Sequence, residues 1–121
     1  MNWYHRCFAA LIGLSVAASA GAAHAQAVLV GSTPASGAKV SSGDFVVHLQ
    51  FNGLIDHVRS HLMLTHPDGS REYLQIAENG PPQELTALVR LTPGAYVLHW
   101  EVLQLGGHLT TGDLNFSANS P

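Results

Sequence analysis

Cysteine is nearly absent from this chain of 121 residues, because the only one, Cys7, lies close to the amino terminus. It begins an uncharged run, residues 7–23, that becomes rich in Ala, Gly and Ser toward its end. The residues beyond this run contain no thiol, which excludes a disulfide framework and a thiolate metal site. A domain formed by them must be held together by its apolar core alone.

Basic residues and methionines are also scarce. Lys and Arg number 5 against 8 Asp and Glu, and one of the five, Arg6, precedes the uncharged run. The acidic excess argues against nucleic acid or an anionic membrane surface as the main partner. After Met1 the chain contains a single methionine, Met63. A thioether cluster for Cu(I) cannot be built from one Met.

Sequence motifs of enzymes are missing. The chain has no nucleophile elbow, no phosphate-binding glycine loop and no pair of cysteines. Ser, His and Asp all occur, but no spacing among them assembles a catalytic triad. The sequence therefore predicts a protein that is not an enzyme.

The amino-terminal segment has the parts of a secretory signal peptide. A short basic head, "MNWYHR", leads into the uncharged run, and "AHA" at residues 23–25 supplies small residues for cleavage. The run is shorter and richer in Ala than the roughly 20 strongly apolar residues that a spanning helix needs. We therefore predict a signal peptide over residues 1–25 and one mature domain over residues 26–121, beginning at Gln26.

Alternation of apolar and polar residues dominates the mature domain. In "FVVHLQF" (45–51) every second residue, from Phe45 to Phe51, is apolar, and "YVLHWEV" (96–102) repeats the pattern. Shorter runs include "HLMLTH" (61–66) and "ELTALVRL" (84–91). A period of two is the signature of half-buried strands.

Turn signals separate these runs. The segments "TPASG", "HPDGS", "NGPP" and "LTPG" combine Pro with Gly, Asp or Ser. Short strands at this spacing predict an all-β fold, an antiparallel β-sandwich. The segment "NGLIDHVRSH" (52–61) is compatible with one helical turn or with a loop.

Histidine is the abundant chemical group. Six histidines follow the predicted cleavage site: His48, His57, His61, His66, His99 and His108. Imidazole is a ligand that suits copper, zinc and nickel. His57 and His61 are four residues apart, which places them on one face of a helix or strand. His48 and His99 fall on outward faces of predicted strands, where a solvated histidine needs no ligand.

Both ends of the mature domain resemble the CopC family of periplasmic copper-binding proteins. "LVGSTPASG" (29–37), followed by a strand that ends in "LQF", resembles the start of that family. "YVLHWEVLQLGGHLTTGDLNF" (96–116) resembles its closing segment, with the following residues in register: Tyr96, Trp100, Gly107, His108, Gly112 and Phe116. The resemblance implies a Greek-key, immunoglobulin-like sandwich of about seven strands, a periplasmic location, and a role in copper homeostasis or resistance.

The resemblance also implies a Cu(II) site at one end of the sandwich. Family members bind through the mature N-terminal His, a carboxylate after the "LQF" position, and the Asp and His of an Asp-Gly-His motif. In this sequence the first three positions hold Gln26, Gly53 and Gly106, and His108 alone remains.

Other donors lie near the lost positions. Asp56 and His57 follow Gly53 closely, so we predict a copper site of His108, His57 and Asp56, with Cu(II) favoured over Cu(I). His24 joins this site only if cleavage precedes it. Alternatively, His108 has a structural role and its ring bonds the neighbouring strand.

Three functions remain open at this point. The first is a monomeric periplasmic copper-binding or copper-handling protein with a reduced or relocated site, for which an inner-membrane copper transport protein is a candidate partner. The second is an interaction module that keeps the fold without the metal. The third is a copper monooxygenase-like brace, which requires an N-terminal His and therefore cleavage after Ala23.

Overall fold

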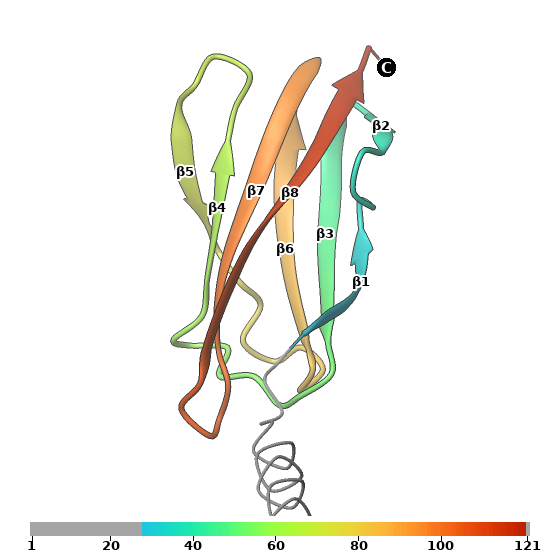
Figure 1. The fold of residues 1–121 in the computed structure, drawn as a ribbon. Helices are drawn as coiled ribbons and strands as arrows, with labels where there is room; N and C mark the ends of the chain where they lie inside the picture. The colour runs from blue at the N-terminus through green and yellow to red at the C-terminus, as the bar shows by residue number, and fades with distance from the viewer. Residues whose placement is uncertain (1–27, 121) are drawn as a thin grey trace, which may run out of the picture.

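The computed structural model describes residues 28–120, which form two β-sheets packed face to face (Figure 1). No helix in this range is long and apolar enough to cross a membrane. The chain forms eight strands: β1 (Leu29–Thr33), β2 (Lys39–Ser41), β3 (Gly43–Phe51), β4 (His61–Thr65), β5 (Arg71–Leu74), β6 (Glu84–Leu91), β7 (Gly94–Leu103) and β8 (Leu109–Asn119).

The strands divide unequally between the sheets. One sheet has three strands in the order β1-β3-β6, and the other has five in the order β2-β8-β7-β4-β5. All pairs are antiparallel except β2 and β8, which run parallel. This confirms the predicted all-β sandwich, and β2 adds a short strand to the seven or so expected.

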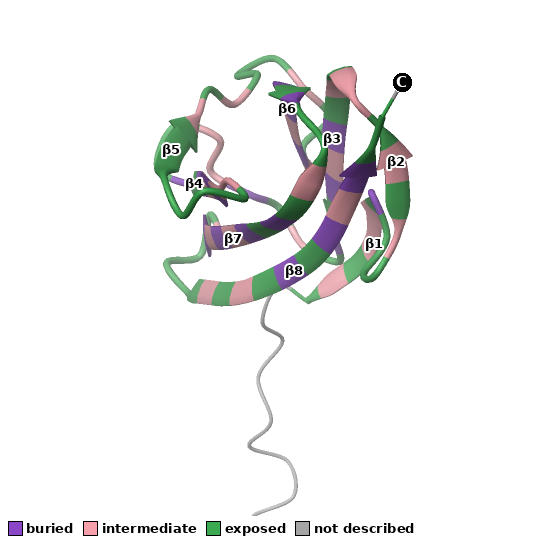
Figure 2. Cartoon of the chain, turned by 90° about the horizontal axis from the view of Figure 1, so that it is seen from above, coloured by how far each residue is buried: buried purple, intermediate pink, exposed green. Residues whose placement is uncertain are grey.

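The core consists of the inward residues that the alternation predicts (Figure 2). On β3 and β6 these include Val47, Leu49 and Leu85, which are fully buried. On β7 they are Tyr96, Leu98, Trp100 and Val102, all buried. The two faces interdigitate, because the ring of Phe51 from one sheet meets the edge of the Trp100 ring from the other, with centroids 6.4 Å apart.

Tyr96 fixes the turn before β7 from inside the core. Its ring stacks on Phe116 with centroids 5.3 Å apart. Its hydroxyl donates to the Thr92 carbonyl at 3.0 Å and accepts from the Thr92 amide at 2.9 Å. A tyrosine bonded to backbone a few residues upstream is a recurrent device of immunoglobulin-like sandwiches.

The segment between β3 and β4 is a loop that contains one turn. The Ser60 amide donates to the Asp56 carbonyl at 3.1 Å and closes that turn. Ile55 forms an isolated bridge with Gln104 from the β7–β8 connection. The loop is therefore tied to the β7–β8 hairpin, at the end of the sandwich where the predicted site residues lie.

Candidate metal centre

Three segments far apart in the sequence meet at one end of the sandwich, which we call the His108 end: residues 52–60, 81–84 and 104–108. The Leu105 amide donates to the Leu54 carbonyl at 3.2 Å, and the Ile55 amide donates to the Pro82 carbonyl at 3.0 Å. The chain also enters the domain here, because the Val28 amide donates to the Asn52 side chain at 2.8 Å. Backbone hydrogen bonds therefore fix the positions of all three segments.

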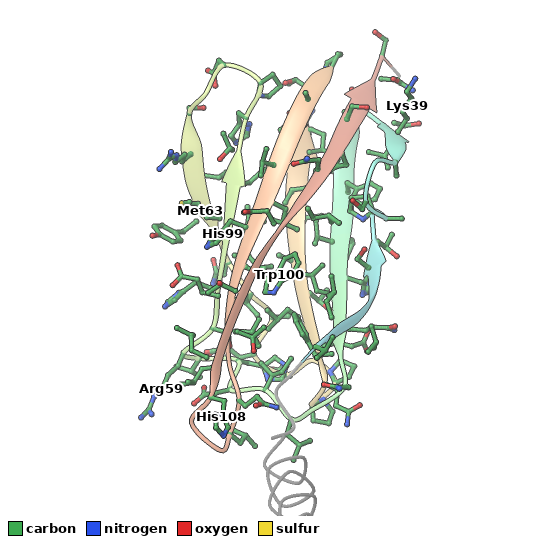
Figure 3. The ribbon with its side chains drawn as sticks, in the orientation of Figure 1. Lys39, Arg59, Met63, His99, Trp100 and His108 are labelled. Carbon is green, nitrogen blue, oxygen red and sulfur yellow. The ribbon has the colours of Figure 1, made fainter. Side chains whose placement is uncertain are left out.

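His108 lies on the connection between β7 and β8, with its side chain at the surface (Figure 3). The Gln104 amide donates to the His108 carbonyl at 2.8 Å, and the Gly107 amide donates to the Gln104 carbonyl at 2.9 Å. These bonds close the hairpin through the backbone alone. The imidazole of His108 stays exposed on a tight turn, which is the placement that a surface metal ligand requires.

Gly53 and Gly106 occupy two of the positions where the family resemblance implies carboxylates. Space at Gly53 is taken by Gln104, because a Cβ atom there would lie 2.6 Å from the Gln104 amide nitrogen. Gly106 faces open space, with no atom within 4 Å of a Cβ atom. Gln104 was not singled out from the sequence. Its contact with Gly53 joins two distant segments, so local sequence patterns do not predict it.

His57 is committed to the backbone of the segment before β6. Its Nε2 lies 2.7 Å from the Glu84 carbonyl oxygen and 3.0 Å from the Pro81 carbonyl oxygen. Carbonyl oxygens only accept, so Nε2 must carry the proton and donate. In the neutral ring this leaves the Nδ1 lone pair as the one nitrogen that His57 can offer to a metal.

Asp56 is partly committed as well. Its Oδ1 accepts from the amides of Val58 and Arg59, both at 3.0 Å, and so caps the turn that follows. The Arg59 guanidinium lies 3.8 Å from the other oxygen, Oδ2. The carboxylate can therefore give a metal only Oδ2, in competition with Arg59.

The predicted ligands are near one another in the fold, but they do not form a preassembled site. Within residues 28–120, no three His, Cys, Asp or Glu side chains are positioned to hold one metal ion. His24 and Gln26 lie outside the described residues. The ligand roles of His108, His57 and Asp56 stay predictions.

Four exposed apolar side chains belong to the segments that meet at the His108 end or directly follow them. They are Leu54, Val58, Leu105 and Leu109, with exposed fractions between 50% and 73%. Sequence reasoning missed this group, because Leu54, Val58 and Leu105 fall in loops and Leu109 is the first residue of β8, where no periodicity marks an exposed apolar side chain.

Three histidines outside the His108 end have polar partners of their own. His66 donates through Nε2 to Glu72 at 2.6 Å. His99 donates through Nδ1 to Asp113 at 2.7 Å. His48 lies 3.5 Å from the Thr86 hydroxyl. The expected outward direction of His48 and His99 is confirmed, and both rings are half-buried against their neighbours.

A family model described as the CopC domain matches residues 29–119 of this chain. No curated protein sequence matches it. Among solved structures, the chain is similar to CopC from Methylosinus trichosporium OB3b, with 24% identity and a TM-score of 0.71 over 78% of this chain and 95% of that one.

A second similar structure is that of PcoC from Escherichia coli, described as a methionine rich copper resistance protein. The identity is 20% and the TM-score 0.66, over 78% of this chain and 100% of that one. At such identities the likeness shows the fold, and it agrees with the predicted sandwich.

Proposed function

The chain belongs to the CopC domain family, and from this premise we propose that it binds copper in the periplasm and serves copper homeostasis or resistance. The single observation that carries the proposal is the exposed His108 on a hairpin that is bonded to the loop containing Asp56 and His57. The similar structure from Escherichia coli is named a copper resistance protein. In this proposal the protein carries copper and has no catalytic role.

The donors available at the His108 end favour Cu(II). They are the His108 imidazole, the Nδ1 atom of His57 and the Oδ2 atom of Asp56, and nitrogen and carboxylate donors suit that ion. Gly53 and Gly106 contribute none. The ion would be held less tightly than in a site with two further carboxylates, because each missing donor leaves a position to water.

The first residue of the exported protein decides whether a further chelate exists. A chain beginning at His24 would offer an amine and an imidazole from one residue, which preorganises two coordination positions. A chain beginning at Gln26 offers neither the histidine nor, once the glutamine cyclises, a free amine. The intact mass of the exported protein distinguishes these two cases.

A second function is supported by the apolar side chains that are exposed at the His108 end. Leu54, Val58, Leu105 and Leu109 are exposed on segments of this end, and exposed apolar side chains mark a contact site for a partner where they form one contiguous patch. An interaction module that docks through this surface, with an inner-membrane copper transport protein as its partner, fits this observation. It requires no bound metal.

Titration of the exported protein with Cu(II) tests the proposal. We expect His108→Ala and His57→Ala each to weaken binding, because each removes one imidazole. His48→Ala is the matched control, since it removes a half-exposed imidazole from the outer face of β3. Binding that is unchanged in both test variants would rule out this site. If the parent protein binds copper no more tightly than isolated surface histidines do, the interaction module is favoured.

A further inference from the structure

Asparagine is followed by glycine at two places in the sequence, residues 52–53 and residues 79–80. Both pairs lie in connections between strands, because β3 ends at Phe51, β5 ends at Leu74 and β6 begins at Glu84. In such a pair the glycine nitrogen can attack the side-chain carbonyl of the asparagine, since glycine has no Cβ atom to hinder a close approach of the backbone. Whether a pair reacts in the folded protein depends on how its two residues are held.

Asn52 is held in a way that favours this attack. The residue is exposed to water, and its Oδ1 atom accepts from the Val28 amide at 2.8 Å. A donor on this oxygen stabilises the negative charge that develops there when a nitrogen attacks Cγ, as the donors of an oxyanion hole do. The Asn52 amide donates in turn to the Val28 carbonyl at 3.1 Å, so the residue keeps its place where the chain enters the domain.

Gly53 supplies the attacking nitrogen. Within residues 28–120, the Gly53 amide donates to no backbone carbonyl, so no such bond has to break before the nitrogen reacts. A Cβ atom at this position would lie 2.6 Å from Nε2 of Gln104, which means that packing against the β7–β8 connection favours glycine here. The contact that excludes a side chain at residue 53 therefore preserves the reactive pair.

We propose that Asn52 is a site of spontaneous deamidation, and that the aspartate formed there gives the His108 end the carboxylate that Gly53 lacks. The Gly53 nitrogen loses its proton and bonds to Cγ of Asn52, while the bond from Cγ to Nδ2 breaks and ammonia leaves. Water then opens the cyclic imide. Attack of water at Cγ restores the normal main chain and gives aspartate, whereas attack at the backbone carbonyl gives isoaspartate. One water is consumed and one ammonia is released, without any oxidant or reductant.

The aspartate product fits the contacts of the parent residue. One carboxylate oxygen can accept from the Val28 amide as Oδ1 does now, and an ionised acceptor makes that hydrogen bond stronger. The second oxygen is then free at the end of the sandwich where the Leu105 amide donates to the Leu54 carbonyl. The value of this oxygen rests on the proposed copper function, because nitrogen and oxygen donors together suit Cu(II). Deamidation thus converts a weaker copper-binding form into a tighter one after synthesis.

Peptide mapping by mass spectrometry tests the modification. The exported protein is kept folded in mildly alkaline buffer, and the same protein unfolded in urea is the reference in which both asparagine–glycine pairs react. We expect the peptide that contains Asn52 to gain the mass of a single deamidation in the folded sample, faster at higher pH because the attacking nitrogen must lose its proton. Isotopically labelled water should place one labelled oxygen in the product. An Asn52 that reacts in the unfolded protein but not in the folded one would overturn the site.

Two variants of residue 52 separate the reaction from its consequence. Asn52→Gln keeps an amide but must close a larger ring, so it should show no mass gain at this residue. Asn52→Asp supplies the product in pure form. We expect Cu(II) to bind about tenfold more tightly to Asn52→Asp than to Asn52→Gln. The gain should disappear when His108→Ala is added, because the new oxygen then has no imidazole to act with.

Asn79 is the internal comparison within the same molecule. It is exposed in the connection between β5 and β6, and Asn79→Gln removes this second reactive pair. In the Asn79→Gln background the intact mass reports Asn52 alone, and we expect it to keep increasing with time. An intact mass that stays constant in this background would contradict the proposal, because all deamidation would then belong to Asn79.

The modification and the copper function fail in distinguishable ways. If Asn52 is deamidated but Asn52→Asp binds Cu(II) no more tightly than Asn52→Gln, the role given to the new carboxylate is wrong. If neither the parent protein nor Asn52→Asp binds Cu(II), the proposed copper function is wrong. The mass measurement decides the modification in either case, since it requires no metal.

Discussion

The two ends of the sandwich use their side chains differently. At the Tyr96 end, formed by the turns at residues 66–70 and 92–94, loop side chains pack on the core and on one another. The His66 ring meets the edge of the Tyr96 ring with centroids 5.4 Å apart, and its Nε2 donates to Glu72. Gly94 lies directly against the ring of Pro67. The polar groups of His66, Glu72 and Tyr96 therefore have their hydrogen-bond partners within the protein.

The His108 end is held mainly by backbone hydrogen bonds. It exposes one imidazole and four apolar side chains, and it has two glycines where the family resemblance implies carboxylates. The same fold thus closes one end with internal contacts and leaves the other with groups that face outward. The copper site and the partner surface that we propose both lie at the His108 end, because exposed donors and exposed apolar side chains occur there together.

The largest difference between the two ends should be their tolerance of a methyl group. Gly94→Ala would make the added Cβ atom overlap with Cγ and Cβ of Pro67, at a φ of 141° that side chains rarely adopt. We expect a loss of about 3 kcal/mol in the free energy of unfolding, from overpacking and backbone strain together. Denaturant unfolding measures it.

Gly106→Ala is the matched substitution at the His108 end. A Cβ atom there meets nothing within 4 Å, and the backbone is outside the left-handed region. We expect a change within about 0.5 kcal/mol. Equal losses in the two variants would show that the ends do not differ in packing.

The Tyr96 hydroxyl should account for the next largest effect. Tyr96→Phe keeps the ring and its stacking on Phe116 but removes two hydrogen bonds to Thr92. We expect destabilisation by about 1–2 kcal/mol, measured by thermal or denaturant unfolding. Tyr73→Phe is the control, because Tyr73 is 70% exposed, and it should unfold like the parent. A neutral Tyr96→Phe would contradict the role given to this hydroxyl.

Adding a carboxylate should strengthen Cu(II) binding at the His108 end. Gly106→Asp places an acid two residues before His108, in open space and without backbone strain. We expect Cu(II) binding to tighten by about tenfold, which corresponds to about 1.4 kcal/mol. Gly106→Asn has nearly the same shape without the charge and should gain much less. If both variants bind like the parent protein, His108 is not a copper ligand.

Strands with one buried and one exposed face could be predicted from the sequence, and strands without this difference could not. The inward residues of β3 and β7 follow a strict period of two because one face packs in the core. β5 exposes Arg71, Glu72 and Tyr73 in succession, so it has no such period. β2 is three residues long and pairs in parallel with β8, far away in the sequence. Only the assembled sheet reveals either strand.

The segments that meet at the candidate site could be predicted from the sequence, but the hydrogen bonds of its side chains could not. The loop after Phe51 and the hairpin that carries His108 meet as the family resemblance implies. The hydrogen bonds of His57 to Pro81 and Glu84 depend on a segment more than 20 residues away. The contact between His99 and Asp113 depends on the register of β7 with β8, which the local sequence of either strand does not encode.

The smallest effect concerns the turn at residues 66–70 of the Tyr96 end. The Ser70 hydroxyl and amide both donate to Oδ1 of Asp68, at 2.6 Å and 2.9 Å. These bonds favour the ionised form and hold the pKa of Asp68 below its ordinary value. The stabilisation is therefore present above that ordinary value and is lost as the pH falls through the lowered pKa.

Ser70→Ala removes the hydroxyl bond and should raise the pKa of Asp68 toward its ordinary value. Because this carboxylate is exposed, the stability change should be small and confined to acid pH. A carboxyl-carbon NMR titration of Asp68 measures the shift directly, with the exposed Ser36→Ala as control. An unmoved pKa in Ser70→Ala would mean that the turn, unlike the rest of this end, is held by backbone alone. The Tyr96 end would then resemble the His108 end in this one respect.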